Sequence, residues 1–247
     1  MAAMIELANV TKIYAMGEVT VNAVAGISMS VEKGELLSIV GQSGSGKSTL
    51  MNILGCLDVP STGRYALEGN DVGQLNDNQL AELRGRKIGF IFQTYNLLPR
   101  LSAQANVQLP LLYGGGKDGR ERSIAALERV GLGHRLHHRP VELSGGEQQR
   151  VGIARALVKN PSIILADEPT GNLDTKSGND IMDILHQLHK EDGITVLIVT
   201  HDPEVAASTE RVVSMRDGYM VGDQTPAEYI RSLSVPLSQS ALLGNSE

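Results

Sequence analysis

The residues from 41 to 49 have types and a spacing that suit phosphate binding. Gly41, Gly46, Lys47 and Ser48 fit the pattern of a glycine, four variable residues, and then glycine, lysine and serine. Glycines let backbone N–H groups face phosphate oxygens, and a helix that starts there adds its positive dipole end. We expect Lys47 to reach the outer phosphates and Ser48 to bind Mg²⁺. The alternative is an accidental glycine-rich turn, which chance produces in such a chain about 1% of the time. The predicted nucleotide contacts here are Gly41, Ser43, Gly44, Ser45, Gly46, Lys47, Ser48 and Thr49.

A second candidate is the apolar run Ile163-Ile-Leu-Ala-Asp-Glu168, which ends in two acids. At the carboxyl end of a strand, Asp167 can hold Mg²⁺ through its water shell and Glu168 can polarise an attacking water. The alternative interpretation is a strand that meets solvent with charged residues. The phosphate loop earlier in the chain favours the catalytic interpretation.

A third candidate is Leu143-Ser-Gly-Gly-Glu-Gln-Gln-Arg150. Ser144, followed three residues later by Glu147, predicts a capping box and the start of a helix. Gly145 and Gly146 leave the N–H groups of the first turn open, which predicts a second anion-binding helix start. An ordinary capped surface helix would explain Ser144 and Glu147 but not two glycines, each of which costs ~1 kcal/mol relative to Ala inside a helix.

The patterns around these residues predict a parallel sheet with crossover helices. The phosphate loop follows the strand-like run 36–40 and precedes apolar residues at helical spacing. Residues 177–190 have one apolar helical face and lie between the two buried-strand runs 163–166 and 194–199. Residues 94–159 look like a helical insert. The predicted strands are 4–10, 19–24, 27–31, 36–40, 163–166 and 194–199, and the predicted insert helices are 102–112, 120–130 and 145–159.

Composition narrows the classes of function. The net charge of −6 and the absence of a basic run argue against a nucleic-acid partner, and the lack of Trp argues against base stacking. A single cysteine, Cys56, fits a reducing compartment. No apolar stretch approaches the ~20 residues of a membrane span. The N-terminus does not look like a secretion signal. These features predict a soluble, intracellular globular protein.

The combination of the phosphate loop, Leu143–Glu147, the strand that ends at Glu168 and a later His201 resembles the ATPase domain of ATP-binding-cassette (ABC) proteins. The resemblance covers residues 4–230. It implies an α/β P-loop NTPase fold with a mostly parallel core sheet, an N-terminal antiparallel β subdomain and a helical subdomain inserted at about 94–159. We therefore expect one ABC ATPase domain over residues 1–232, followed by a C-terminal tail over 233–247.

In that family two ATPase domains face each other head to tail around two MgATP. The phosphate loop of one domain and the Ser-Gly-Gly helix start of the other close on the same γ-phosphate. The resemblance therefore implies a homodimer in which Ser144, Gly145, Gly146 and Glu147 contact the nucleotide of the partner. ATP and Mg²⁺ are the implied cofactors, and ATP hydrolysis is the implied activity.

Further residues match family motifs one at a time. Gln93 resembles the glutamine-loop residue that contacts Mg²⁺ and water. His201 resembles the switch histidine on the γ-phosphate, and Tyr14 resembles the aromatic residue that stacks on adenine. Gly171-Asn-Leu-Asp174 resembles the loop that lines the dimer interface. Without the family context, each would be an ordinary loop or strand-end residue. The implied catalytic set is Glu168, His201 and Gln93, and the implied Mg²⁺ set is Ser48, Gln93 and Asp167, the last through water.

The runs 52–58, 89–99, 106–110 and 165–174 resemble the branch that contains lipoprotein-releasing, macrolide-exporter and cell-division ATPases. This implies a peripheral protein on the cytoplasmic face of a bacterial inner membrane. It would drive a permease, docked near residues 94–140, that exports or extracts a lipoprotein, macrolide or peptide. The alternative is an ATP-dependent regulatory subunit of a cell-division type that transports nothing. A small-molecule kinase would leave the Ser144–Gly146 segment without a purpose.

Overall fold

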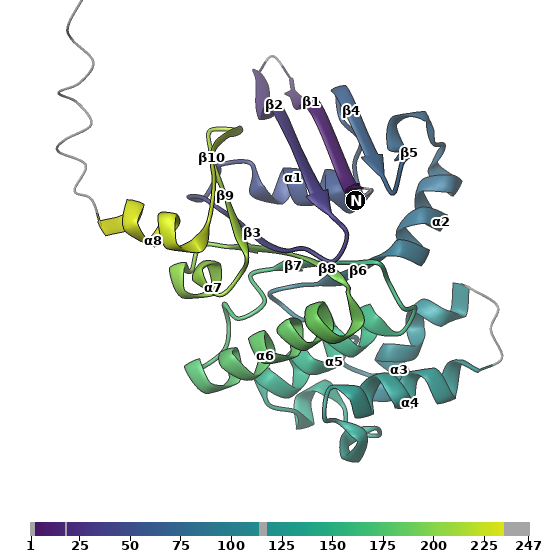
Figure 1. Ribbon diagram of the computed structural model, residues 1–247. Helices are drawn as coiled ribbons and strands as arrows, with labels where there is room; N and C mark the ends of the chain where they lie inside the picture. Colours follow the sequence, from purple (N-terminus) through teal and green to yellow (C-terminus); the bar gives the residue numbers. More distant parts are fainter. Residues whose placement is uncertain (1–2, 18, 114–117, 235–247) are drawn as a thin grey trace, which may run out of the picture.

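The computed structural model describes residues 3–17, 19–113 and 118–234. A six-stranded sheet runs through the molecule in the order β10-β9-β3-β8-β7-β6 (Figure 1). Only β10 is antiparallel to its neighbour. Every residue of β3 and β8 is buried, as expected for strands covered on both faces. The strands are β3 (Leu36–Val40), β6 (Ile88–Ile91), β7 (Ile163–Asp167), β8 (Thr195–Thr200), β9 (Arg211–Arg216) and β10 (Tyr219–Gln224).

A second, antiparallel sheet has the order β2-β1-β4-β5 and consists of β1 (Ala3–Met16), β2 (Val19–Glu32), β4 (Thr62–Leu67) and β5 (Asn70–Asp71). The prediction of two separate strands over 19–24 and 27–31 is wrong. The register passes from Val10 opposite Ile27 to Thr11 opposite Ala25, which leaves Gly26 unpaired with φ +78°. A β-bulge therefore absorbs the glycine, and β2 continues as one strand.

The two faces of the central sheet belong to two different cores, because alternate side chains of a strand point to opposite faces. Leu165 and Leu197 join the core that contains α1 (Lys47–Leu54) and the antiparallel sheet. Their neighbours Ile164 and Ile198 join the core formed with the inserted helices. The phosphate-loop helix and the helical insert therefore pack on opposite faces of the sheet.

The predicted insert is helical. It lies between β6 and β7 in the sequence, and its helices lie below the central sheet in Figure 1. The helix predicted over 102–112 is shorter, because Pro110 has no N–H to continue it. It becomes α3 (Ala103–Gln108) followed by a 3₁₀ turn over Leu109–Tyr113. The other helices here are α4 (Gly119–Arg129) and α5 (Gly145–Leu157), and 3₁₀ turns occupy Gly133–Arg135 and Pro140–Glu142.

The helix predicted over 177–190 is α6 (Thr175–Asp192), which begins with Asp174 accepting a hydrogen bond from Ser177 N–H and ends at Gly193. Sequence analysis gave no prediction for α2 (Asp77–Lys87), α7 (Pro203–Ala207), α8 (Pro226–Ser234) or the turn Val72–Gln74. Of the predicted tail, residues 233–234 belong to α8 and residues 235–247 lie outside the described residues. Within the described ranges, no helix combines the length and apolarity needed to cross a bilayer.

Candidate nucleotide site

The loop between β3 and α1 has no room for side chains at two of its glycines. A Cβ on Gly41 would lie 2.4 Å from the Met215 carbonyl oxygen, and one on Gly46 would lie 2.3 Å from the Ala23 carbonyl oxygen. Gly46 also has φ +98° where it caps α1. The conformation that sequence analysis predicted as a phosphate cradle therefore requires glycine at both positions.

A cleft of about 920 Å³ opens over this loop, near the upper end of the ~300–1,000 Å³ usual for small-molecule sites. It brings together most of the predicted site, including Asp167 and Glu168 at the end of β7 and also Gln93 and His201. Val21–Ala23 and Asp217–Gly218 also line it and were not predicted. Asp-Gly between two strands is a hairpin signal that could have located the second pair. The lining residues are Val21, Asn22, Ala23, Gln42, Ser43, Gly44, Gly46, Lys47, Ser48, Thr49, Gln93, Asp167, Glu168, Val199, His201, Asp217 and Gly218.

Lys47 bends back onto its own loop. Its Nζ atom donates hydrogen bonds to the carbonyl oxygens of Gly41 at 2.7 Å and Gln42 at 2.8 Å. Burial lowers the pKa of Lys47, against the opposing charges of Glu168 and Asp167. The ammonium group therefore lies inside the loop, within the field of the two acids, where phosphate oxygens could replace its carbonyl partners.

The two acids at the end of β7 differ in environment. Burial raises the pKa of Asp167, the neighbouring Glu168 raises it further, and Lys47 opposes both effects. Glu168 has a left-handed backbone, with φ 45°, and its N–H donates to the Val199 carbonyl oxygen at 2.8 Å. A non-glycine residue in this region is strained, and such strain often marks a functional position.

Both carboxylate oxygens of Glu168 have partners. Oε1 lies 2.6 Å from Nδ1 of His201, and Oε2 accepts a hydrogen bond of 3.1 Å from the Thr200 hydroxyl. The His201 side chain is 71% exposed, whereas that of Glu168 is 14% exposed, so the histidine can move away more easily than the acid. Thr200 is not among the predicted site residues, although its place at the end of β8, directly before His201, is a local indication of such a role.

Gln93 lies two residues after β6 and lines the same cleft. Asn172 donates a hydrogen bond of 2.9 Å to the Gln93 carbonyl oxygen, so the glutamine loop is tied to the loop that follows Glu168. Ser48, Gln93 and Asp167 present hydroxyl, amide and carboxylate oxygens, which are the donors that Mg²⁺ prefers together with water and phosphate. The predicted Mg²⁺ residues therefore fit the ion in their chemistry. No cluster of three His, Cys, Asp or Glu suited to a metal occurs in the described part of the chain.

The helix that starts at Ser144 does not contribute to this cleft. The predicted capping box is present, because Ser144 Oγ accepts from Glu147 N–H at 3.2 Å while Glu147 Oε2 accepts from Ser144 N–H at 2.8 Å. The two glycines also have a packing role: a Cβ on Gly145 would lie 3.1 Å from the Tyr95 hydroxyl, and one on Gly146 would lie 3.1 Å from Ser177. None of residues 144–147 lines the cleft of its own chain.

Tyr14 lies on β1 opposite Val21, a lining residue of the cleft, but is not itself a lining residue. Its hydroxyl donates a hydrogen bond of 2.9 Å to Asp58 Oδ2. Burial raises the pKa of Tyr14 and Asp58 raises it further, so the phenol stays neutral. Stacking on adenine remains a prediction.

Comparison with known proteins decides the family. The sequence model of the ABC transporter family matches residues 24–171, which is more than half of the chain. The chain belongs to the ABC transporter family. This ABC chain has the expected α/β fold, with its mostly parallel sheet, antiparallel sheet and helical subdomain.

Two curated relatives show how much of an ABC protein the chain matches. It is 54% identical over 224 residues to an uncharacterized ABC transporter ATP-binding protein of Thermotoga maritima, covering 90% of this chain and 95% of the relative. It is 52% identical over 219 residues to the macrolide export ATP-binding/permease protein MacB of Syntrophobacter fumaroxidans, covering 87% of this chain. The chain spans only 31% of that MacB protein.

A solved structure agrees with the fold. The ATP-binding cassette MJ0796, in a dimeric post-hydrolysis state bound to ADP and Pi, superposes with a TM-score of 0.83 at 45% identity. The match covers 90% of this chain and 99% of the other.

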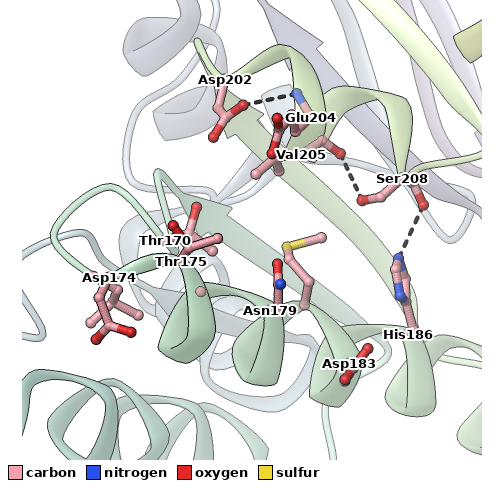
Figure 2. A pocket seen from close by; sticks show the side chains of 13 residues that line it. Thr170, Asp174, Thr175, Asn179, Asp183, His186, Asp202, Glu204, Val205 and Ser208 are labelled. Carbon is pink, nitrogen blue, oxygen red and sulfur yellow. Dashed lines mark hydrogen bonds between the residues drawn. The ribbon is translucent and has the colours of Figure 1, made fainter.

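A second hollow of about 490 Å³ lies between α6 and α7, outside the nucleotide cleft (Figure 2). Four carboxylates surround it: Asp174, Asp183, Asp202 and Glu204. His186 donates to the Ser208 carbonyl oxygen across it at 3.0 Å. An anionic triphosphate is disfavoured among four acids, so the ABC cleft over the phosphate loop is the better nucleotide site.

Proposed function

We propose that this chain binds MgATP in the cleft over the phosphate loop and that two copies close head to tail around two nucleotides. The observation that carries the proposal is the separation of the two helix starts. Ser144 is exposed and lies outside the cleft of its own chain, whereas the phosphate loop lies inside it. A second copy can bring its Ser144 to the open side of the cleft. The similarity to a dimeric cassette supports this arrangement.

Within the closed site, the residues of this chain bind and position the reacting groups. Lys47 and the loop N–H groups would hold the outer phosphates in place of the carbonyl oxygens that Lys47 now contacts. Ser48, Gln93 and Asp167 would hold Mg²⁺, which neutralises charge on the phosphates. Glu168 would orient a water or accept its proton, and His201 would turn from Glu168 toward the γ-phosphate.

We further propose that the closure drives a membrane permease at the cytoplasmic face of a bacterial inner membrane, with export or extraction of a lipoprotein, macrolide or peptide. Support comes from the 52% identity to a macrolide export ATP-binding/permease protein. The proposed domain covers residues 1–232, with residues 94–140 as the permease-facing part.

One groove beside that part supports permease docking. It has a volume of about 270 Å³, and its lining includes Phe90 and Phe92 from the sheet side of the chain and Pro110 and Ala156 from the insert. The exposed Leu57 also lines it, together with the basic residues Arg84, Arg155 and Lys159. Its lining is mostly apolar, so an apolar segment of a permease could bind there.

The test uses the Glu168→Gln chain, which should bind MgATP but not hydrolyse it. We expect light scattering to show a dimer with MgATP and a monomer without it. Affinity purification of the same chain from detergent-solubilised membranes should recover a permease with a large extracytoplasmic domain. Cargo movement coupled to ATP turnover would favour transport. Function retained with minimal turnover would favour the cell-division-type regulatory subunit, and a monomer under all conditions would contradict the dimer.

A further inference from the structure

We propose that Asp58 and Lys12 are positioning residues that hold Tyr14 as the platform for the base of the nucleotide. The inference rests on the proposed nucleotide site and extends it from the phosphates to the base. Both residues act through Tyr14. They therefore affect recognition of the base and leave recognition of the phosphates unchanged.

The contacts form a closed triangle. Lys12 Nζ donates to Asp58 Oδ1 at 2.5 Å, and the Tyr14 hydroxyl donates to Asp58 Oδ2 at 2.9 Å. Lys12 Nζ also lies over the Tyr14 ring, 5.2 Å from its centroid, within the range of a cation–π interaction. The phenol is thus held at its oxygen, and a cation lies over its ring. The proposal places the base of the nucleotide against the opposite face of the ring.

Asp58 is itself held firmly. Its Oδ1 accepts a hydrogen bond of 2.8 Å from Val59 N–H, and its own N–H donates to the Asn52 carbonyl oxygen at 3.2 Å. Burial raises the pKa of Asp58, but the hydrogen bonds from Lys12, Tyr14 and Val59 outweigh burial and bring the pKa below its ordinary value. The carboxylate is therefore charged at neutral pH and accepts from three donors.

The position of Asp58 in the chain links the two ends of the nucleotide site. It follows α1, the helix that begins at Lys47 in the phosphate loop. Eight residues of α-helix span roughly 12 Å. One rigid element thus carries the phosphate cradle at its start, and the anchor of the base platform follows its end. Tyr14 pairs across β1 and β2 with Val21, which lines the cleft.

In a purely structural role, Asp58 and Lys12 would only stabilise the packing of β1 against the segment after α1. To separate the two roles, we would measure the dissociation constants of ATP and of inorganic triphosphate for the same variants. Triphosphate has no base, so a base platform cannot affect it. Base–aromatic stacking contributes about 1–3 kcal/mol, which corresponds to about fivefold or more in affinity. Asp58→Asn should therefore raise the Kd of ATP about fivefold and leave that of triphosphate unchanged.

Two further variants sharpen the test. Tyr14→Phe keeps the ring and removes only the hydroxyl, and it should weaken ATP binding in the same direction. The double variant should be no weaker than the worse single variant, because both remove one interaction. The matched control is Asp71→Asn in the same sheet. Its partner is Arg64 at 3.1 Å, and its side-chain exposure of 24% is close to the 27% of Asp58. It should leave both constants unchanged.

The positioning role is overturned if Asp58→Asn keeps its affinity for ATP. It is also overturned if Asp58→Asn loses affinity for ATP and for triphosphate equally. If Asp58→Asn unfolds, Tyr14→Phe alone makes the comparison. Lys47→Ala should lose affinity for both ligands. If Lys47→Ala keeps its affinity for both ligands, the proposed nucleotide site is wrong and the inference about Tyr14 fails with it. If Lys47→Ala loses both affinities and Asp58→Asn loses neither, the nucleotide site stands and only the positioning role is wrong.

Discussion

Nδ1 of His201 lies 2.6 Å from Oε1 of Glu168, so the residue proposed to polarise water is already hydrogen-bonded to the residue proposed to contact the γ-phosphate. The Thr200 hydroxyl donates a hydrogen bond of 3.1 Å to the other carboxylate oxygen of Glu168. In this structure both carboxylate oxygens of the acid therefore already have a hydrogen-bond partner. Rotation of the exposed His201 would free Oε1, while Thr200 would keep Oε2 in place.

Glu168→Gln should retain MgATP binding and reduce hydrolysis by about 10²–10⁴-fold, the usual contribution of a general base. Phosphate release and nucleotide affinity measured on the same preparation check this. Asp183→Asn, an acid of the second hollow outside the cleft, is the control and should hydrolyse ATP normally. Wild-type turnover in Glu168→Gln would remove Glu168 from its proposed role.

Lys47→Ala should raise the Kd of MgATP about 10–100-fold, because a hydrogen bond to a charged group contributes about 1.5–3 kcal/mol. Calorimetric titration with MgATP measures the change. Lys176→Ala removes an exposed lysine at the start of α6 and should have no effect. An unchanged affinity in Lys47→Ala would contradict the phosphate-loop assignment.

Ser144→Asp should preserve the monomer and abolish the ATP-dependent dimer. Aspartate caps helices as well as serine does, so α5 should still begin normally. Its charge would, however, oppose the γ-phosphate of the partner. Light scattering of the Glu168→Gln chain with and without this change shows the effect.

The control for that prediction is Ser102→Asp, because Ser102 caps α3 in the same way, accepting from Ala105 N–H at 3.2 Å. It should leave the dimer intact. A dimer that persists in Ser144→Asp would show that this helix start lies away from the partner's nucleotide.

Arg211 should matter for stability. It donates to both carboxylate oxygens of Asp223 at 2.7 and 2.6 Å and also to the Ser30 carbonyl oxygen and Glu35. It therefore joins the β9–β10 hairpin to the end of β2 and to the turn before β3. Arg211→Met should lower the free energy of unfolding by about 1–2 kcal/mol, a value reduced for partial exposure. Urea unfolding measures it, and Arg216→Met, an exposed arginine on the same strand, should change little.

The same pair has a pH signature. Hydrogen bonding to Arg211 holds the pKa of Asp223 below its ordinary value of 3.8, against the effect of burial. The stabilisation is therefore present above pH 3.8 and lost as the pH falls through the folded-state value. The stability difference between wild type and Asp223→Asn should be full at neutral pH and shrink below about pH 4. A difference that grows in acid would contradict this assignment.

The predictable parts of the molecule were those with strong local patterns. The glycine spacing before Lys47, the capping box at Ser144 and the apolar run before Asp167 each indicate their structure without distant contacts. The hairpin at Asp217–Gly218 also has a local signal, the Asp-Gly pair between two strands. Thr200 next to Glu168 was not predictable in this way, because the contact depends on the parallel register of β7 and β8.

The contact between Tyr14 and Asp58 was also beyond the local patterns. The two residues are 44 positions apart in the sequence, and nothing near Asp58 indicates a partner on β1. The single strand β2 was missed for a related reason: Gly26 looks like an interruption in the sequence, but the bulge that accommodates it depends on β1.

The close approach at Gly146 has a mechanical consequence. A side chain there would meet Ser177, so the first turns of α5 and α6 touch without a spacer. Gln149 on α5 also donates to the Pro169 carbonyl oxygen at 2.7 Å, directly after Glu168. The first turns of α5 are therefore in direct contact both with α6 and with the peptide that follows Glu168. A displacement of α5 would be passed to the backbone beside Glu168 through these two contacts.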